Sequence, residues 1–485
     1  MRKTLLLFTL LLFGLQGWAT TFTVDGVTYT IIDATNKTVA IGAEASYTPA
    51  ISTSTTGTFT IPSSVSYNGD AYAVTAIGDN AFYNCRAITL VTIPNNITSI
   101  GKEAFRECEG LTSVTIPSSV SILGDDAFYG CSQLKSAIIL GSLTSIPDLA
   151  FCWCTSLASV NIPSSVTSIG KYAFYPCALT SITIPNSVIS IGEDAFRSCE
   201  QLASIDIPGS VTTIGNQAFS GTAITSVTIP NSVTTIGSDA FSSTALTSIT
   251  IPGSVTALGS HPFSNCTNLS SIIVDGNNPN YCSSDGVLFN KAKTTIIQYP
   301  AGNINTSYNI PGTTISIGDY AFSSALLTSI SIPKSVSSIG SYAFNWSNLT
   351  SMSIPNNVTS IGSNAFRSCR KLTSATIPNS LTSIADNMFN DCEALTTVII
   401  PTSVTSIGEF AFNYCTALSS VTIPASVRSI GNSAFYYCTS LASIYANSST
   451  PANITLGSDV FYSVPSTCKL YVPTGFNLLY AAASQ

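Results

Sequence analysis

Charged residues are scarce in this chain of 485 residues, because Lys, Arg, Asp and Glu make up only 8% of it, against about 25% in a typical soluble protein. The net charge is −7, and no basic stripe is present. A nucleic-acid-binding protein needs such a stripe to neutralise phosphates, so nucleic acid is excluded as a partner. The low charge does not predict disorder, since 45% of the residues are hydrophobic and recur at regular positions.

Histidine is nearly absent, with His261 as its single instance. A single histidine argues against Ser-His and Cys-His catalytic systems. We expect His261 to be a solvated loop residue. Acidic pairs such as Asp125-Asp126 fall at variable positions, whereas a catalytic pair needs two carboxylates fixed across a cleft. No phosphate-binding loop or metal-binding motif occurs. The sequence predicts a protein that is not an enzyme and has no metal or other cofactor.

Long hydrophobic runs are missing except at the N-terminus. There, Arg2 and Lys3 precede an apolar run over residues 5–15, and the segment ends in Gly17-Trp18-Ala19. This pattern is typical of a secretory signal peptide over residues 1–19. The alternative, a membrane anchor, would need about 20 apolar residues. We expect a protein that is secreted or located on the extracellular cell surface, with no membrane insertion after signal cleavage.

A repeat of 22 or 23 residues dominates the rest of the chain. LTSVTIPSSVSILGDDAFYGC at 111–131 recurs as LASVNIPSSVTSIGKYAFYPC at 157–177. Leu111, Val114 and Ile116 have the LxxLxL spacing of leucine-rich repeats. Alternation over 111–116 predicts a short strand, which Pro117 ends. The remainder should cross the opposite side of the coil in turns, extended pieces or one helical turn.

One repeat cannot bury its apolar side alone, so the repeats must stack. The sequence therefore predicts a repeat solenoid, mainly β: a leucine-rich-repeat arc with short parallel strands on its concave face and a β-hairpin cap at its N-terminal end. Each repeat contributes one phenylalanine to a buried column. These are Phe82, Phe105, Phe128, Phe151, Phe174, Phe196, Phe219, Phe241, Phe263, Phe322, Phe344, Phe366, Phe389, Phe412 and Phe435.

Two positions of the repeat favour small residues. The glycine seven residues after the proline, such as Gly124, is replaced by Pro147 and Ala385 in other repeats. Because proline fixes φ near −65°, that position needs a small residue and no left-handed backbone.

Cysteine recurs three residues after the phenylalanine and supplies most of the 14 cysteines. Disulfides are one interpretation in an exported protein, and zinc a weaker one. However, Thr222, Ala325 and Ser347 occupy the same position, so we expect a small buried side chain. Cys152, Cys282 and Cys468 lie outside this pattern, and their redox state is left open.

The repeat is interrupted in three places. Asp25-Gly26 and Asn68-Gly69 lie between alternating segments and indicate hairpins, so residues 20–75 are expected to form the N-terminal β cap. Repeats then fill 76–274 and 311–446. Residues 275–310 predict an irregular variant repeat with a hairpin around Asn290–Lys293, and residues 447–485 a C-terminal cap.

The unit LxxVxIPxxVxxIGxxAFxxC resembles the BspA-like leucine-rich repeat family, also called the Treponema pallidum type. Leu111, Pro117, Gly124, Phe128 and Cys131 carry much of the match. LYVPTG at 470–475 resembles the terminal segment of the family, after which the cap is expected to be truncated. The resemblance implies a secreted or surface protein that binds proteins, as an adhesin for host matrix proteins, host cells or other microbes.

Specificity can reside only where the repeats differ. Trp, Tyr and Arg are the usual binding hot spots, and they gather one or two residues after the phenylalanines. The middle repeats carry Ser at the same place, and aromatic residues and Arg return near the C-terminus, as at Arg367 and Tyr436. The predicted ligand-binding edge consists of Tyr83, Arg106, Tyr129, Trp153, Tyr175 and Arg197.

The alternative is that these are ordinary loop residues and that the protein binds glycans or forms a structural surface layer. In that case the outward strand positions, such as Ser113 and Thr115, would matter more.

Overall fold

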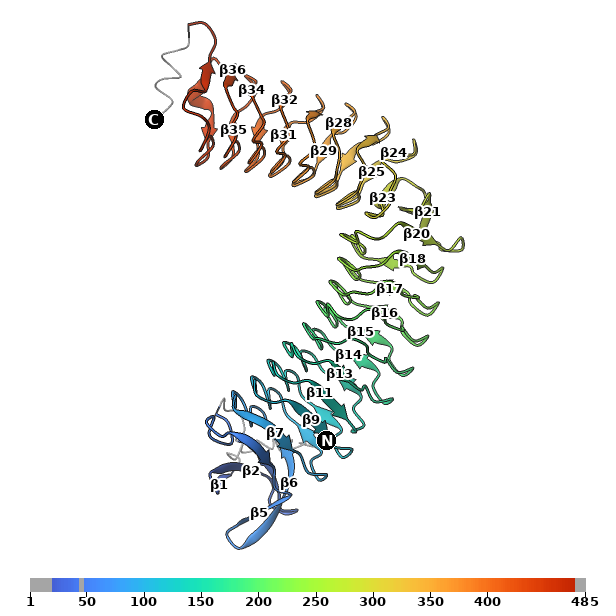
Figure 1. Ribbon diagram of the computed structural model, residues 1–485, viewed down its shortest axis with the longest axis vertical. Helices are drawn as coiled ribbons and strands as arrows, with labels where there is room; N and C mark the ends of the chain where they lie inside the picture. The colour runs from blue at the N-terminus through green and yellow to red at the C-terminus, as the bar shows by residue number, and fades with distance from the viewer. Residues whose placement is uncertain (1–19, 43–47, 476–485) are drawn as a thin grey trace, which may run out of the picture.

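The structure, a computed structural model, describes residues 20–42 and 48–475. The predicted signal peptide at 1–19 lies outside the described residues. Figure 1 shows stacked coils that form an open C, with a bend near the middle of the chain. Among the described residues the only helical element is a 3-10 turn, Pro451–Asn453. The prediction of a mainly β solenoid is therefore confirmed.

Each rung of the solenoid has three sides, as the rung of Phe128 shows. Strand β9 (Ser113–Ile116) is the predicted strand, and it pairs in parallel with β7 (Ile88–Thr92) and β11 (Ser136–Ile139). A second strand of two residues, β10 (Ile122–Leu123), pairs in parallel with β8 (Ser99–Ile100). Equivalent residues face each other in register, as Ser136 does Ser113. We call these two arrays the SVTI ladder and the SI ladder.

The SVTI ladder continues through β13 (Ser159–Val160), β18 (Ser248–Ile251), β20 (Ser271–Val274), β24 (Ser307–Asn309), β26 (Ser329–Ser331), β28 (Ser351–Ser353), β30 (Ser374–Thr376), β32 (Thr397–Ile399), β34 (Ser420–Ile423), β36 (Ser443–Ala446) and β38 (Lys469–Tyr471). The SI ladder continues through β12 (Ser145–Ile146), β14 (Ser168–Ile169), β15 (Ser190–Ile191), β16 (Thr213–Ile214), β17 (Thr235–Ile236), β19 (Ala257–Leu258), β25 (Ser316–Ile317), β27 (Ser338–Ile339), β29 (Ser360–Ile361), β31 (Ser383–Ile384), β33 (Ser406–Ile407), β35 (Ser429–Ile430) and β37 (Thr455–Leu456). In the second block, Figure 1 places β29, β31 and β35 on the inner side of the bend and β28, β32 and β34 on the outer side. The short parallel strands on the inner side there are thus those of the SI ladder.

The third side, which we call the turn face, consists of two consecutive turns around the phenylalanine. The residues two before and two after it have left-handed backbone, as Asp126 (φ 56°) and Gly130 (φ 73°) do. Alternate amides donate to the next rung, including Phe128 N to Ala150 O at 2.9 Å. No helical turn forms here. Left-handed residues interrupt the right-handed backbone, so the amides point to the neighbouring rung and do not bond within one turn of helix.

The phenylalanines form the predicted buried column. Neighbouring rings stack with centroids 4.8 Å apart for Phe82 and Phe105 and 6.0 Å apart for Phe241 and Phe263. The small-residue position is explained by close approach of rungs, since a Cβ on Gly124 would lie 2.4 Å from Lys102 N. The backbone of Gly124 is not left-handed, as predicted.

The cysteines pack against this column. All 14 are free, and all except the half-buried Cys282 and Cys468 are buried. Cys131 Sγ donates to Phe105 O of the preceding rung at 3.2 Å, and Cys154 repeats the contact with Phe128 O at 3.1 Å. Burial raises the pKa of the Cys199 and Cys438 thiols to about 12. The packing interpretation is confirmed, and the disulfide interpretation is not.

The N-terminal cap begins both ladders. It contains β1 (Thr21–Val24), β2 (Val27–Asp33), β3 (Thr38–Ile41), β4 (Gly57–Thr60), β5 (Ser64–Tyr67) and β6 (Asp70–Ile77). Asp25-Gly26 joins the antiparallel pair β1 and β2, and Asn68-Gly69 joins β5 and β6. Strand β6 then pairs with β8 and β4 with β7, so the cap covers the edges of the first rung.

The array breaks at β21 (Tyr281–Ser284), β22 (Val287–Asn290) and β23 (Thr295–Gln298), which form an antiparallel meander. Strand β23 then pairs in parallel with β25 and restarts the SI ladder. Tyr299 takes the phenylalanine position of this rung and stacks on Phe322 at 5.2 Å. Leu288 belongs to the core of the first block, whereas Val287 and Phe289 belong to that of the second. Strand β22 therefore separates two hydrophobic cores.

The segment after Ala446, which was predicted to be the C-terminal cap, forms one further rung. Strand β37 pairs with β35, and β38 pairs with β36. Phe461 extends the column by stacking on Phe435 at 5.4 Å.

Candidate functional site

The six predicted ligand-binding residues lie together on the turn face of the first block. Each follows a buried phenylalanine by one residue, except Trp153, which follows by two. Because the phenylalanine column is in register, the side chains next to it stack into a line, which we call the binding edge. Trp153 is 45% exposed, and the other five members are half-buried. The binding edge consists of Tyr83, Arg106, Tyr129, Trp153, Tyr175 and Arg197.

Arg106 connects two rungs of the binding edge. Its Cζ lies 4.3 Å from the centroid of the Tyr129 ring, a cation–π contact. Its Nη1 also lies 3.4 Å from Asp126 Oδ1. Asp126 is buried, and burial raises the pKa of its carboxyl while Arg106 lowers it in part. The carboxylate therefore holds the guanidinium in place from the buried side.

A second group surrounds Tyr175. Trp153 meets its ring edge-on with centroids 5.8 Å apart, and Arg197 Cζ lies 5.5 Å from its centroid. Arg197 is held by Asp194, whose Oδ1 is 3.0 Å from Nη1 and which is almost fully buried. Arginines paired with buried carboxylates and packed on aromatic rings lose little further freedom on binding, which favours recognition.

Tyr172 belongs to the same group and was missed by the sequence analysis. Its ring lies edge-on to Tyr175 at 5.8 Å, and a hydrogen bond to Asp194 raises the pKa of its hydroxyl. The position alone gave little signal, because two residues before the phenylalanine other repeats carry residues as different as Asp194, Leu149 and Tyr320.

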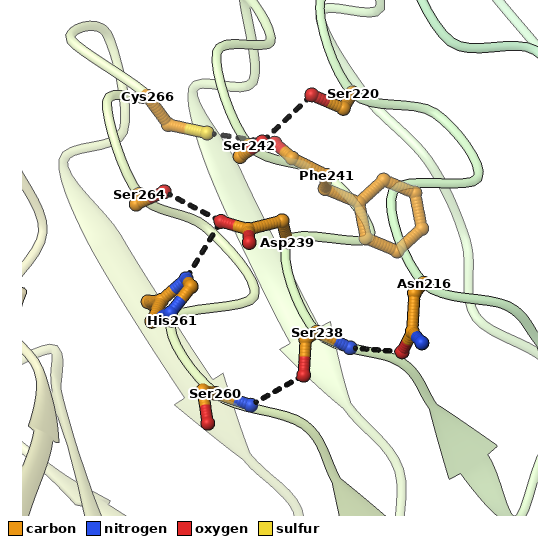
Figure 2. A network of polar contacts seen from close by, with 10 residues as sticks. All are labelled: Asn216, Ser220, Ser238, Asp239, Phe241, Ser242, Ser260, His261, Ser264 and Cys266. Carbon is orange, nitrogen blue, oxygen red and sulfur yellow. Dashed lines mark hydrogen bonds and ion pairs between the residues drawn. The ribbon is translucent and has the colours of Figure 1, made fainter. Parts of the chain in front are cut away.

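Among the described residues, the positions of the middle rungs that correspond to the binding edge carry no comparable anchors. The residues equivalent to the binding edge are serines, and Ser220 Oγ lies 2.8 Å from Ser242 Oγ in a mutual hydrogen bond that Figure 2 shows. Ser242, Ser264 and Ser323 are all buried. The first six rungs therefore present aromatic and arginine side chains on the turn face, whereas the middle rungs carry serines, most of them buried, at the same positions.

The expectation of a solvated His261 is wrong. Its Nδ1 lies 2.6 Å from Asp239 Oδ1, which also accepts a hydrogen bond from Ser264 Oγ at 3.1 Å (Figure 2). Across the break, its ring lies 4.5 Å from that of Tyr320. The reason is local: the turn faces of the rungs of Phe263 and Phe322 meet across the inserted meander, as the hydrogen bond from Ser324 Oγ to Asn265 Oδ1 at 3.1 Å also shows. His261 therefore has a structural position at the junction.

A groove of about 300 Å³ lies on the SVTI ladder of the first block. Ser113 and Thr115 form its floor, and the exposed side chains of Leu90 and Leu140 line it. The sequence analysis listed the two hydroxyl residues but not the leucines. This groove is the strongest feature in favour of the glycan alternative.

In the described part of the chain no three His, Cys, Asp or Glu side chains converge on a metal site. Across residues 20–42 and 48–475 no helix is long and apolar enough to cross a membrane.

Known proteins share this repeat and this fold. The family model of the BspA type leucine rich repeat region matches residues 75–203, 167–284, 301–417 and 359–483. A leucine rich cell surface protein from Faecalibacterium prausnitzii is similar in structure, with 30% identity and a TM-score of 0.54 over 88% of this chain and 94% of that one. A leucine-rich repeat protein from Eubacterium ventriosum has 24% identity and a TM-score of 0.54 over 95% and 98%.

No curated protein matches the sequence. The matched repeats nevertheless extend over most of the chain, and they include the residues that form the phenylalanine column, the two ladders and the binding edge. The chain belongs to the BspA-type leucine-rich repeat family.

Proposed function

We propose that this is a secreted or cell-surface protein that binds other proteins, acting as an adhesin for host matrix proteins, host cells or other microbes. The binding edge contacts the partner. The observation that carries the proposal is the pair of arginine–tyrosine contacts, Arg106 on Tyr129 and Arg197 on Tyr175, each fixed by a buried carboxylate. Such preorganised Arg, Tyr and Trp side chains are what protein interfaces use as hot spots.

The proposed location agrees with the family and with the F. prausnitzii relative, which is described as a cell surface protein. The second candidate function is glycan binding, which the groove between Leu90 and Leu140 favours.

The test is to screen the purified chain against immobilised extracellular-matrix proteins and a glycan array. The triple variant Tyr129→Ser, Tyr175→Ser, Arg197→Ser should lose at least 10-fold in affinity for the protein that binds. The control variant is Trp346→Ser with Arg370→Ser, which removes a comparable cation–π pair of 5.1 Å from the second block. Unchanged affinity in the triple variant, or binding to glycans alone, would contradict the proposal.

A further inference from the structure

Four tyrosines form a second exposed aromatic surface at the C-terminal end of the turn face. Tyr414 stacks on Tyr437 with centroids 4.9 Å apart and planes 14° apart, and Tyr436 stacks on Tyr462 at 5.0 Å and 12°. The two pairs also touch, since Tyr436 and Tyr437 lie 4.9 Å apart. We call these residues, on the rungs of Phe412, Phe435 and Phe461, the tyrosine cluster.

Among the described residues, the rings of the tyrosine cluster are not covered by a guanidinium, in contrast to the aromatic groups of the binding edge around Tyr129 and Tyr175 and to Trp346 in the second block. Tyr462 is 54% exposed and Tyr414 42%. Contiguous exposed apolar surface of this kind is typical of interaction sites.

The stacking geometry shapes this surface into ridges. Rings about 3.5 Å thick whose centroids are about 5 Å apart must be offset, so each ring leaves part of its face open, with a shallow slot between neighbours. The ring centroids from Tyr414 through Tyr437 and Tyr436 to Tyr462 are 4.9, 4.9 and 5.0 Å apart in turn. Tyr414 and Tyr462 lie on rungs two steps apart, so their rings are separated by about 10 Å.

That spacing matches one peptide conformation. A polyproline II helix advances about 3.1 Å per residue with three residues per turn, so every third residue returns to the same side after about 9 Å. Proline rings pack between aromatic side chains in known grooves for such peptides. The backbone carbonyls of this helix make no internal hydrogen bonds, and tyrosine hydroxyls can donate to them.

The charge around the cluster agrees with this ligand. Burial, the neighbouring tyrosines and Asp459 all raise the pKa of Tyr436, so its hydroxyl stays protonated and able to donate. Asp459 lies close enough to act on the cluster, and in the described ranges no guanidinium lies over its rings. This charge disfavours anionic ligands and suits a peptide with a flanking Lys or Arg.

We propose that the tyrosine cluster binds a proline-rich segment of a partner protein in the polyproline II conformation, with Tyr414 and Tyr462 receiving residues three apart. This site lies in the second block and is separate from the binding edge, which lies in the first block, and it does not depend on the function proposed for that edge. A neutral glycan is the competing ligand, but it would stack on an open, flat ring face, and the offset pairs present only part of each face.

The experiment measures binding of the full chain to a 12-residue peptide of repeating Pro-Pro-Ala with a terminal Lys, by tyrosine fluorescence and calorimetry. A Gly-Ser peptide of equal length and charge and a neutral oligosaccharide are the competing probes. The variant is Tyr437→Ser with Tyr462→Ser. The matched control is Tyr445→Ser with Tyr471→Ser, a stacked and exposed pair of 4.7 Å on the SVTI ladder of the same end.

The proposal predicts that the proline-rich peptide binds at least 10-fold more tightly than the Gly-Ser peptide. The cluster variant should lose at least 10-fold in affinity, the control variant less than 2-fold, and the binding-edge variant should behave as wild type. No binding of the proline-rich peptide at 1 mM, equal loss in both double variants, or preference for the oligosaccharide would overturn it.

Discussion

Leu288 and Phe289 are neighbours in the sequence but belong to different hydrophobic cores. Both side chains are fully buried in strand β22, Leu288 among the residues of the first block and Phe289 among those of the second. Successive residues of a strand point to opposite faces, so β22 lies between two stacks of rungs and contributes side chains to both cores. The chain is therefore two solenoid blocks that share one strand.

This arrangement predicts that substitutions on the two faces of β22 destabilise different blocks. Leu288→Ala should cost about 2–5 kcal/mol and Phe289→Ala about 3–5 kcal/mol. Because repeat arrays transmit instability mainly to their neighbours, hydrogen exchange should rise in β18–β20 for the first variant and in β25–β27 for the second. The same exchange pattern in both variants would show that the blocks share one cooperative core.

The close approach of rungs predicts a strong difference between two glycines at different positions of the repeat. A Cβ on Gly237 would lie 2.4 Å from Asn216 N, whereas a Cβ on Gly209 would meet nothing within 4 Å. Gly237→Ala should therefore lower the free energy of unfolding by about 1–3 kcal/mol through overpacking, and Gly209→Ala should leave it nearly unchanged. Denaturant unfolding followed by circular dichroism measures both. Equal stability of the two variants would refute the packing explanation.

The sequence predicted the solenoid, the phenylalanine column and the burial of the recurring cysteines, because these depend on positions that recur in register. It did not reveal the SI ladder, since a two-residue strand such as Ser99–Ile100 is too short to show a period. The left-handed positions of the turn face were also missed, because residues such as Leu149 and Tyr172 occupy them in place of glycine. Their signal lay in the asparagines and aspartates that other rungs carry there.

The burial of the thiols predicts how the protein responds to pH. In the folded chain the pKa of Cys199, Cys369 and Cys438 is raised to about 12, from an ordinary value of 9.0. The unfolded chain therefore loses these protons first, and stability that is present below pH 9 should fall as the pH rises from 9 to 12. Urea unfolding at pH 8 and pH 10.5 measures this decrease.

Thiol counting provides the independent check. At pH 8 the native protein should react slowly with a thiol reagent, apart from the half-buried Cys282 and Cys468, whereas the unfolded protein should titrate all 14 cysteines without reductant. Fewer than 14 thiols after unfolding would mean that disulfides exist.

The line of side chains on the binding edge could be read from the sequence, because it follows the phenylalanines at a fixed offset. The contacts within it could not. Arg106 and Asp126 are 20 residues apart, and only the register of the rungs brings them together. His261 was misjudged for the same reason, since its partner Tyr320 lies beyond the inserted meander.

The central claim is that specificity resides in the variable residues of the binding edge, and oxidative footprinting tests it most directly. The full chain is labelled with hydroxyl radicals alone and with the matrix protein that it binds, and oxidation is quantified by mass spectrometry. The account predicts at least 5-fold protection of Tyr129, Trp153 and Tyr175, with Leu90 and Leu140 unchanged. Protection of the leucine-lined groove with no change at those three aromatic residues would contradict it.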